Sequence, residues 1–105
     1  MKEITNRVAY ESIPKSGKVL LVFSAPWCGH CVHFKPVLKS FEEKYPNSVD
    51  INIIDIDDLE DVAEKYDIMS IPSIVLLENG RATKRHVGGL SVEEMTGFVG
   101  IQDKH

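Results

Sequence analysis

The stretch KVLLVFSAPWCGHCVHFKP, residues 18–36, joins a buried strand, a pair of cysteines and the start of a helix. KVLLVFS is an apolar run rich in β-branched side chains, which is typical of a strand buried on both faces. Pro36 lies inside the helical pattern that follows, so we expect it to kink the helix rather than end it. The apolar stripe of this helix consists of Phe34, Val37, Leu38, Phe41 and Tyr45.

The two cysteines take different positions in this pattern. Extended backward, the stripe reaches Cys31, which should therefore face the interior. Cys28 falls at the start of the helix, where unpaired backbone N–H groups and the positive end of the helix dipole favour thiolate over thiol. We therefore expect Cys28 to be the accessible nucleophile and Cys31 the sheltered resolving thiol of a disulfide exchange. Gly29 leaves room for a reacting chain.

Two other interpretations of the cysteine pair stay open. The thiols could be inert or could form a small surface disulfide. A metal site would use the cysteines with His30 and His33. Structural zinc sites normally take their second ligand pair from a distant segment, and the distant histidines here are His86 and His105. We predict no metal ligand and no cofactor, and we expect His33 to be a solvated surface residue.

The rest of the chain predicts a mixed sheet with helices on both faces. VDINIIDI, residues 49–56, is a second strand, parallel to the first because a helix connects them. SIVLLENGRATKRHV, residues 73–87, predicts an antiparallel hairpin around Asn79-Gly80. The α/β pattern is thus a βαβ half followed by a ββα half, in a single domain of residues 1–105.

Three further helices are expected from local signals. Apolar residues Val8, Ala9 and Ile13 indicate a short N-terminal helix that ends near Pro14 and Gly17. The other two helices begin with capping boxes, and a hydrophobic staple supports the second. These boxes are Asp57 with Glu60 and Ser91 with Glu94, and the staple is Leu90 with Met95.

Composition excludes several classes of function. The chain is 43% hydrophobic and 27% charged with a net charge of −4, and it has no basic run, so we expect no nucleic-acid partner. The longest apolar run, Val19–Phe23, is far shorter than the roughly 18 residues of a membrane span. The first residues lack the apolar core of a signal peptide, and two cysteines suit a reducing compartment. We therefore expect a cytoplasmic monomer.

Together these segments resemble the thioredoxin superfamily over nearly the whole chain. The matching elements are VLLVFSAPWCGHC, Pro36, SIPSIVLLENG and VGGLS. The resemblance implies a thioredoxin fold with a cis peptide bond before Pro72, although Pro72 could simply begin a strand. It also implies that the Ile71 backbone pairs with an extended substrate segment. Trp27 and Gly88 would border a flat apolar docking surface, although Trp27 could instead belong to the core.

Two departures from the family pattern bear on mechanism. The Gly-His pair between the cysteines resembles protein disulfide isomerase domains rather than Gly-Pro thioredoxins. A partly protonated His30 would stabilise the Cys28 thiolate and make the couple more oxidising, unless His30 is solvated and has little effect. The family's buried acid is replaced by Val22, and a lysine common on the neighbouring strand is replaced by Ile53. We hypothesise that Cys31 then relies on water or His30 for proton transfer.

The sequence therefore predicts a thiol–disulfide oxidoreductase that reduces protein disulfides through its CGHC motif. Its partners would be disulfide-containing proteins and a recycling system, either a thioredoxin reductase-like enzyme or glutathione. Two alternatives stay open. The protein could act as a disulfide oxidase or isomerase, or it could be a binding subunit that uses the docking surface without redox turnover.

Overall fold

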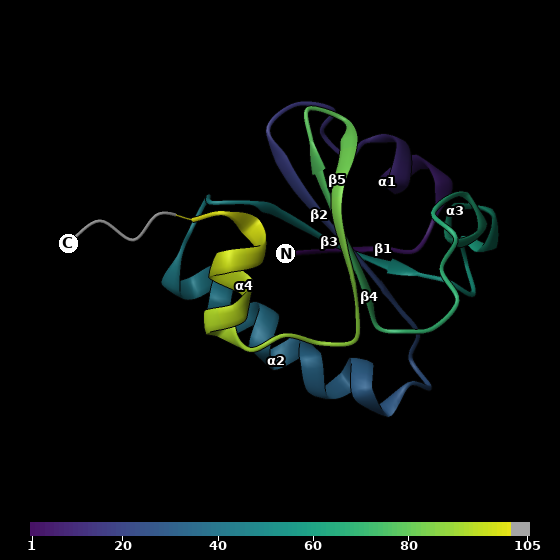
Figure 1. The fold of residues 1–105 in the computed structure, drawn as a ribbon. Helices are drawn as coiled ribbons and strands as arrows, with labels where there is room; N and C mark the ends of the chain where they lie inside the picture. The colour runs from purple at the N-terminus through teal and green to yellow at the C-terminus, as the bar shows by residue number, and fades with distance from the viewer. Residues whose placement is uncertain (102–105) are drawn as a thin grey trace.

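The computed structural model describes residues 1–101 and contains a five-stranded sheet with helices on both sides (Figure 1). None of the helices in this part of the chain has the length and apolar character needed to cross a membrane. In chain order the elements are β1 (Lys2–Ile4), α1 (Arg7–Glu11), β2 (Lys18–Ser24), α2 (Gly29–Lys44), β3 (Asp50–Asp55), α3 (Glu60–Lys65), β4 (Ser73–Glu78), β5 (Arg81–Val87) and α4 (Val92–Val99).

The sheet is mixed, as the sequence predicts, and has the strand order β1-β3-β2-β4-β5. β2 pairs with β3 in parallel and with β4 in antiparallel orientation, so it lies at the centre of the sheet. α2 and α4 cover one face, while α1 and α3 cover the other (Figure 1). The chain therefore has the predicted βαβ and ββα halves, and the α/β fold class is confirmed.

β2 supplies side chains to both of the large apolar clusters. Leu20 and Val22 belong to the cluster beneath α2 and α4, which also contains Phe34 and Phe41. Val19, Leu21 and Phe23 belong to the cluster on the opposite face. This alternation follows from the two-residue period of a strand. The alternation therefore directs Leu20 and Val22 toward α2, the helix that carries Cys31.

Local signals in the second half of the chain are also confirmed. The β4–β5 turn has positive φ at Asn79 (51°) and Gly80 (83°), which is the geometry that an Asn-Gly hairpin turn requires. The Ser91 hydroxyl accepts from the Glu94 N–H, and the Glu94 carboxylate accepts from the Ser91 N–H. This capping box begins α4, and Leu90 packs in the same cluster as Met95.

Two features differ from the sequence prediction. β1 was not expected, because it has only three residues and only Ile4 is buried, which leaves no period to detect. The predicted Asp57–Glu60 capping box is wrong. α3 begins instead after Leu59, whose side chain makes no capping hydrogen bond. The helix at the cysteines continues past Pro36 to Lys44, as expected.

Candidate active site

Cys28 is the N-cap residue of α2. Its Sγ accepts a hydrogen bond from the Cys31 N–H at 3.3 Å, and its thiol contacts the Ile71 carbonyl oxygen at 3.8 Å. A backbone N–H group thus points at the sulfur from the positive end of the helix, where a thiolate is stabilised. This geometry is the one expected of a nucleophilic cysteine.

The exposure of Cys28 differs from our expectation, whereas that of Cys31 agrees with it. We expected an accessible Cys28 and a sheltered Cys31, but the two residues are 8% and 6% exposed. Cys28 is covered because its sulfur turns back beneath the helix start, and both cysteines pack with Ala25 and Ile71. Their position on α2, rather than their overall burial, therefore distinguishes the two cysteines.

The surroundings of Cys31 hold it in the thiol form. Burial raises the pKa of the Cys31 thiol, and its contact with Cys28 raises this pKa further. The Ser24 hydroxyl and the Ala25 backbone act in the opposite direction, because they can bond to a thiolate. Cys31 must therefore lose a proton before it can attack a sulfur.

The loop before β4 lies against the cysteines. The Ile71–Pro72 peptide bond is cis, which is the geometry that the resemblance implies. The Pro72 carbonyl accepts a hydrogen bond from the Gly88 N–H at 2.8 Å. Gly88 has φ +97°, a conformation that side-chain-bearing residues rarely adopt. The fold thus brings Ile71, Pro72 and Gly88 to the site from distant parts of the sequence.

Trp27 lies on the surface beside Cys28 and is not a core residue, because it is 68% exposed. Its indole N–H donates to the Asp57 carboxylate at 2.8 Å, which holds the ring in place. Met69, close to Ile71 in the sequence, is 94% exposed. Sequence reasoning missed Asp57 as a site residue. The place of Asp57 directly after β3, at the same edge of the sheet as Cys28, is the signal that could have found it.

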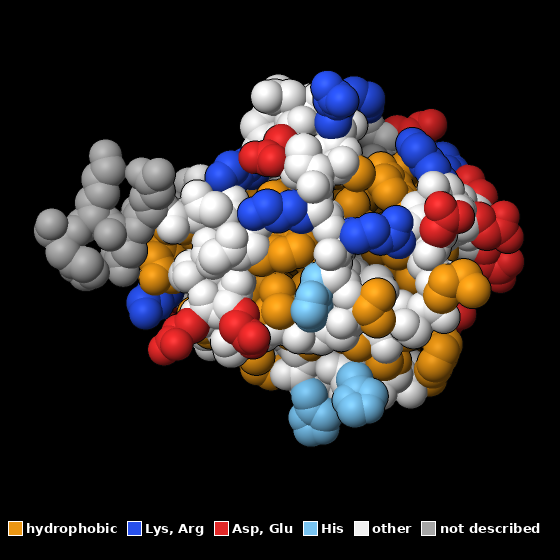
Figure 2. Space-filling view, viewed as in Figure 1, with side chains coloured by type: hydrophobic (Ala, Val, Ile, Leu, Met, Phe, Trp, Pro, Cys, Tyr) orange, Lys and Arg blue, Asp and Glu red, His pale blue; other side chains and the backbone are white. Residues whose placement is uncertain are grey.

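The histidines are spread over the surface. His30 and His33 are both exposed, and Figure 2 shows histidine side chains on the surface over the first turns of α2. His86 is half-buried with its ring edge against Phe98. Within residues 1–101 no group of three or more His, Cys, Asp or Glu side chains is placed to hold a metal ion. His105, the other distant candidate ligand, lies outside the described residues.

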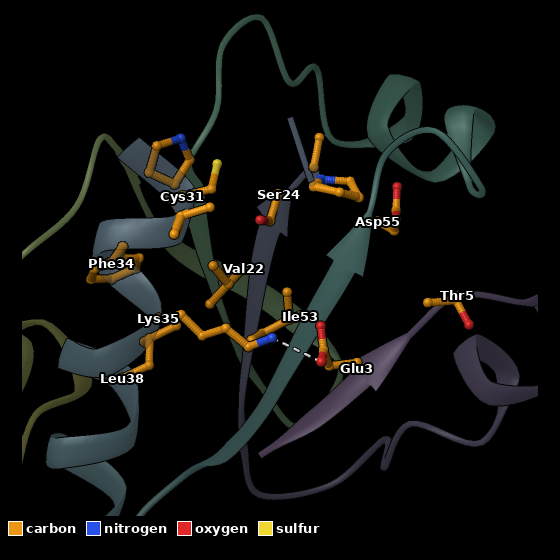
Figure 3. A pocket seen from close by; sticks show the side chains of 14 residues that line it. Glu3, Thr5, Val22, Ser24, Cys31, Phe34, Lys35, Leu38, Ile53 and Asp55 are labelled. Atoms are coloured by element: carbon orange, nitrogen blue, oxygen red, sulfur yellow. Dashed lines mark hydrogen bonds and ion pairs between the residues drawn. The ribbon is translucent and has the colours of Figure 1, made fainter. Parts of the chain in front are cut away.

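A pocket of about 180 Å³ lies behind Cys31, between the sheet and α2 (Figure 3). Val22 and Ile53 line it and are neighbours in the β2–β3 pairing, so the two positions that lack the acid and the lysine are adjacent. Its polar lining comes from Thr5, Ser24 and Asp55 and from an ion pair at the rim, Lys35 to Glu3 at 2.8 Å (Figure 3).

Comparisons with known proteins agree with this geometry. The sequence model of the thioredoxin family matches residues 2–100. A thioredoxin H-type of Fagopyrum esculentum is 38% identical over 80 residues, which cover 75% of this chain and 68% of the relative. Thioredoxin of Staphylococcus aureus is 33% identical over 96 residues, covering 91% and 89%.

Solved structures show the same fold. The structure of a mutant thioredoxin from Halobacterium salinarum has a TM-score of 0.80 at 22% identity, covering 92% of this chain and 85% of that one. The family supports thiol–disulfide oxidoreductase chemistry and, in general, disulfide-containing protein substrates with recycling by a reductase. The cysteine pair at the start of α2, the cis-proline loop and the sequence matches together show that this chain belongs to the thioredoxin family.

Proposed function

We propose that this protein reduces disulfide bonds of proteins, with Cys28 as the attacking thiol and Cys31 as the resolving thiol. The observation that carries the proposal is the position of the Cys28 sulfur. It accepts the Cys31 N–H at the start of α2 and lies beside the loop that contains Pro72. A disulfide that approaches between Trp27 and Ile71 would meet this sulfur first.

The reaction follows from these positions. The Cys28 thiolate attacks one sulfur of the substrate disulfide, and the other substrate sulfur leaves as a thiolate and takes up a proton. Cys31 then loses its proton and attacks the Cys28 sulfur. The second substrate thiol is released and the Cys28–Cys31 disulfide forms, so two electrons pass from the protein to the substrate.

The surface beside Cys28 supports a protein substrate. Trp27 is held in an exposed position by Asp57, and the half-buried Ile71 leaves its backbone next to the cysteines. A Cβ atom on Gly29 would meet no atom within 4 Å, so the space above the helix start is open. An extended segment could pair with the Ile71 backbone there, as a strand is added to an edge.

The redox poise is the second part of the proposal. His30 follows Cys28 by two residues on the exposed start of α2, where a positive charge would stabilise the thiolate and therefore the reduced protein. Thioredoxin and protein disulfide isomerase have potentials of about −270 and about −180 mV. We propose a value between these two for the Cys28–Cys31 couple.

The direction of net electron flow depends on the compartment as well as on this potential. In the cytoplasm, a thioredoxin reductase-like enzyme or glutathione would return the couple to the dithiol, and the protein would act as a reductase. In an oxidising compartment the same couple would act as an oxidase or isomerase. A binding role without turnover would use the surface around Trp27, Ile71 and Gly88.

Equilibration of the protein with glutathione buffers of known potential tests both the proposed disulfide-reducing function and the proposed potential of the Cys28–Cys31 couple. The Cys28–Cys31 disulfide is quantified after alkylation, and insulin reduction is followed in parallel. We expect a potential less negative than that of a His30→Pro variant and equal to that of a His33→Gln control. A wild-type protein that forms no intramolecular disulfide, or fails to reduce insulin, would overturn the function. Equal potentials for the wild type and His30→Pro would overturn the role of His30.

A further inference from the structure

Two polar side chains, Ser24 and Asp55, line the pocket behind Cys31 together with apolar side chains. Ser24 and Asp55 are neighbours in the β2–β3 pairing, as are Val22 and Ile53 two residues earlier. Side chains two residues apart on a strand face the same side of the sheet, so all four face α2. Figure 3 shows Ser24 between Cys31 and Asp55, with Asp55 on the far side of the pocket from Cys31, and Val22 and Ile53 earlier on the two strands.

Ser24 is in contact with the resolving cysteine. Both residues line the same pocket, Ser24 lowers the pKa of the Cys31 thiol, and a hydroxyl can both accept a proton and donate one. Asp55 is half-buried at the end of β3, and its Oδ1 accepts the Asp57 N–H at 2.9 Å. The pocket between them has room for several water molecules. Water in this pocket would link the Ser24 hydroxyl to the Asp55 carboxylate, because both side chains line it.

We propose that Ser24 and Asp55 carry the proton of Cys31 during the resolving step, a role that rests on the disulfide exchange proposed above. As Cys31 attacks the Cys28 sulfur in the mixed disulfide, its proton passes to the Ser24 oxygen. The Ser24 proton passes through water to Asp55 in the same step. A Cys28–Cys31 bond forms, the bond from Cys28 to the substrate breaks, and the departing substrate thiolate takes a proton from solvent.

The other charged groups at the pocket are already paired with each other. Lys35 of α2 donates to Glu3 of β1 at 2.8 Å, and both residues are exposed at the rim. Asp55 makes no ion pair with any group in residues 1–101. Among the charged side chains that line the pocket from β1, β3 and α2, the Asp55 carboxylate is therefore the one without an ion-pair partner in residues 1–101, and it can accept the proton.

The reaction of the reduced protein with dithionitrobenzoate separates the two cysteines. Attack by Cys28 releases one coloured thiolate, and resolution by Cys31 releases a second, so stopped-flow absorbance records two phases. We expect Ser24→Ala and Asp55→Asn to slow the second phase about 10-fold near neutral pH, because they remove a positioned proton acceptor. The first phase should not change. The difference should disappear at high pH, where Cys31 ionises without help.

Two variants control for structural effects. Ser24→Thr keeps a hydroxyl and should restore the second phase, while Thr5→Val removes a different hydroxyl of the same pocket and should have no effect. A second phase in Ser24→Ala with the wild-type rate and pH profile would overturn the proton path. A wild-type protein that shows only the first phase would instead overturn the disulfide exchange itself.

Discussion

Substitution of Val22 by aspartate tests how the missing buried acid affects turnover. Val22 is 2% exposed and packs with Phe34 and Leu38 beneath α2. Loss of its apolar burial costs about 1.5–3 kcal/mol, and burial of a carboxyl group next to a pocket that can hold water adds about 1–3 kcal/mol. The expected loss of about 2.5–6 kcal/mol is smaller than the stability of most domains, about 5–15 kcal/mol, so the variant should fold.

The destabilisation should depend on pH. Burial raises the pKa of the introduced carboxyl above its unfolded value of about 3.9. The variant should therefore be least destabilised below that pH and should lose stability as the pH rises through the folded-state pKa. Val22→Asn is the matched control, because it loses the same apolar burial without a titrating group. Urea unfolding between pH 4 and pH 8 measures the difference between the two variants.

Although Val22→Asp should lower stability, it should speed turnover. The new carboxylate would lie on the same face as Ser24, two residues earlier on β2, and would give Cys31 a second proton acceptor. We expect the second phase of the dithionitrobenzoate reaction to be about 3- to 10-fold faster in Val22→Asp than in Val22→Asn at neutral pH. Equal rates and equal pH profiles for the two variants would refute this reasoning.

Three further predictions concern stability. Because folding raises the pKa of the Cys31 thiol, its contribution to the stability of the reduced protein is complete below the unfolded-state pKa and is lost as the pH rises through the folded-state pKa. Urea unfolding should show this alkaline loss of stability in the wild type and less of it in Cys31→Ser. Gly88→Ala should lower the thermal midpoint because φ is +97°, whereas Gly29→Ala, with open space around its Cβ, should leave it nearly unchanged. Ser91→Ala should cost about 1 kcal/mol in urea unfolding at pH 7, because it removes the hydroxyl that accepts the Glu94 N–H. The Ser91 backbone N–H, which is the main cause of the lowered Glu94 pKa, is retained, so most of this loss should persist at acid pH; a loss that vanishes as Glu94 becomes protonated would contradict this.

The parts of the fold that sequence reasoning predicts are those with a local periodic signal. KVLLVFS corresponds to β2, and SIVLLENGRATKRHV corresponds to β4 and β5, because an apolar run or an Asn-Gly turn marks their limits. β1 carries no such signal. Its three residues are placed by pairing with β3, which is a long-range interaction that no local pattern shows.

The same distinction applies to the site. The place of Cys28 at a helix start follows from the apolar stripe of α2, which a reader can trace in the sequence. The low exposure of Cys28 depends on the contact of its sulfur with Ile71, far away in the chain. Asp57 has the spacing of a capping residue but bonds to Trp27 instead, because the β3–α3 turn brings it beside the cysteine loop. The pairing of Ser24 with Asp55 depends on the strand register in the same way.

Trapping of a mixed disulfide tests most directly whether Cys28 is the attacking thiol. A Cys31→Ser variant cannot resolve the intermediate and should accumulate a covalent adduct in which Cys28, after attack on an insulin disulfide, remains bonded to one insulin sulfur; the adduct is visible as a mass increase that dithiothreitol removes. Peptide mapping should place the adduct on Cys28. A matched Cys28→Ser variant, in which Cys31 is held as a buried thiol, should form little or none. Adducts on Cys31 in the Cys28→Ser variant at the rate seen for Cys28, or no adduct in Cys31→Ser, would contradict the assignment.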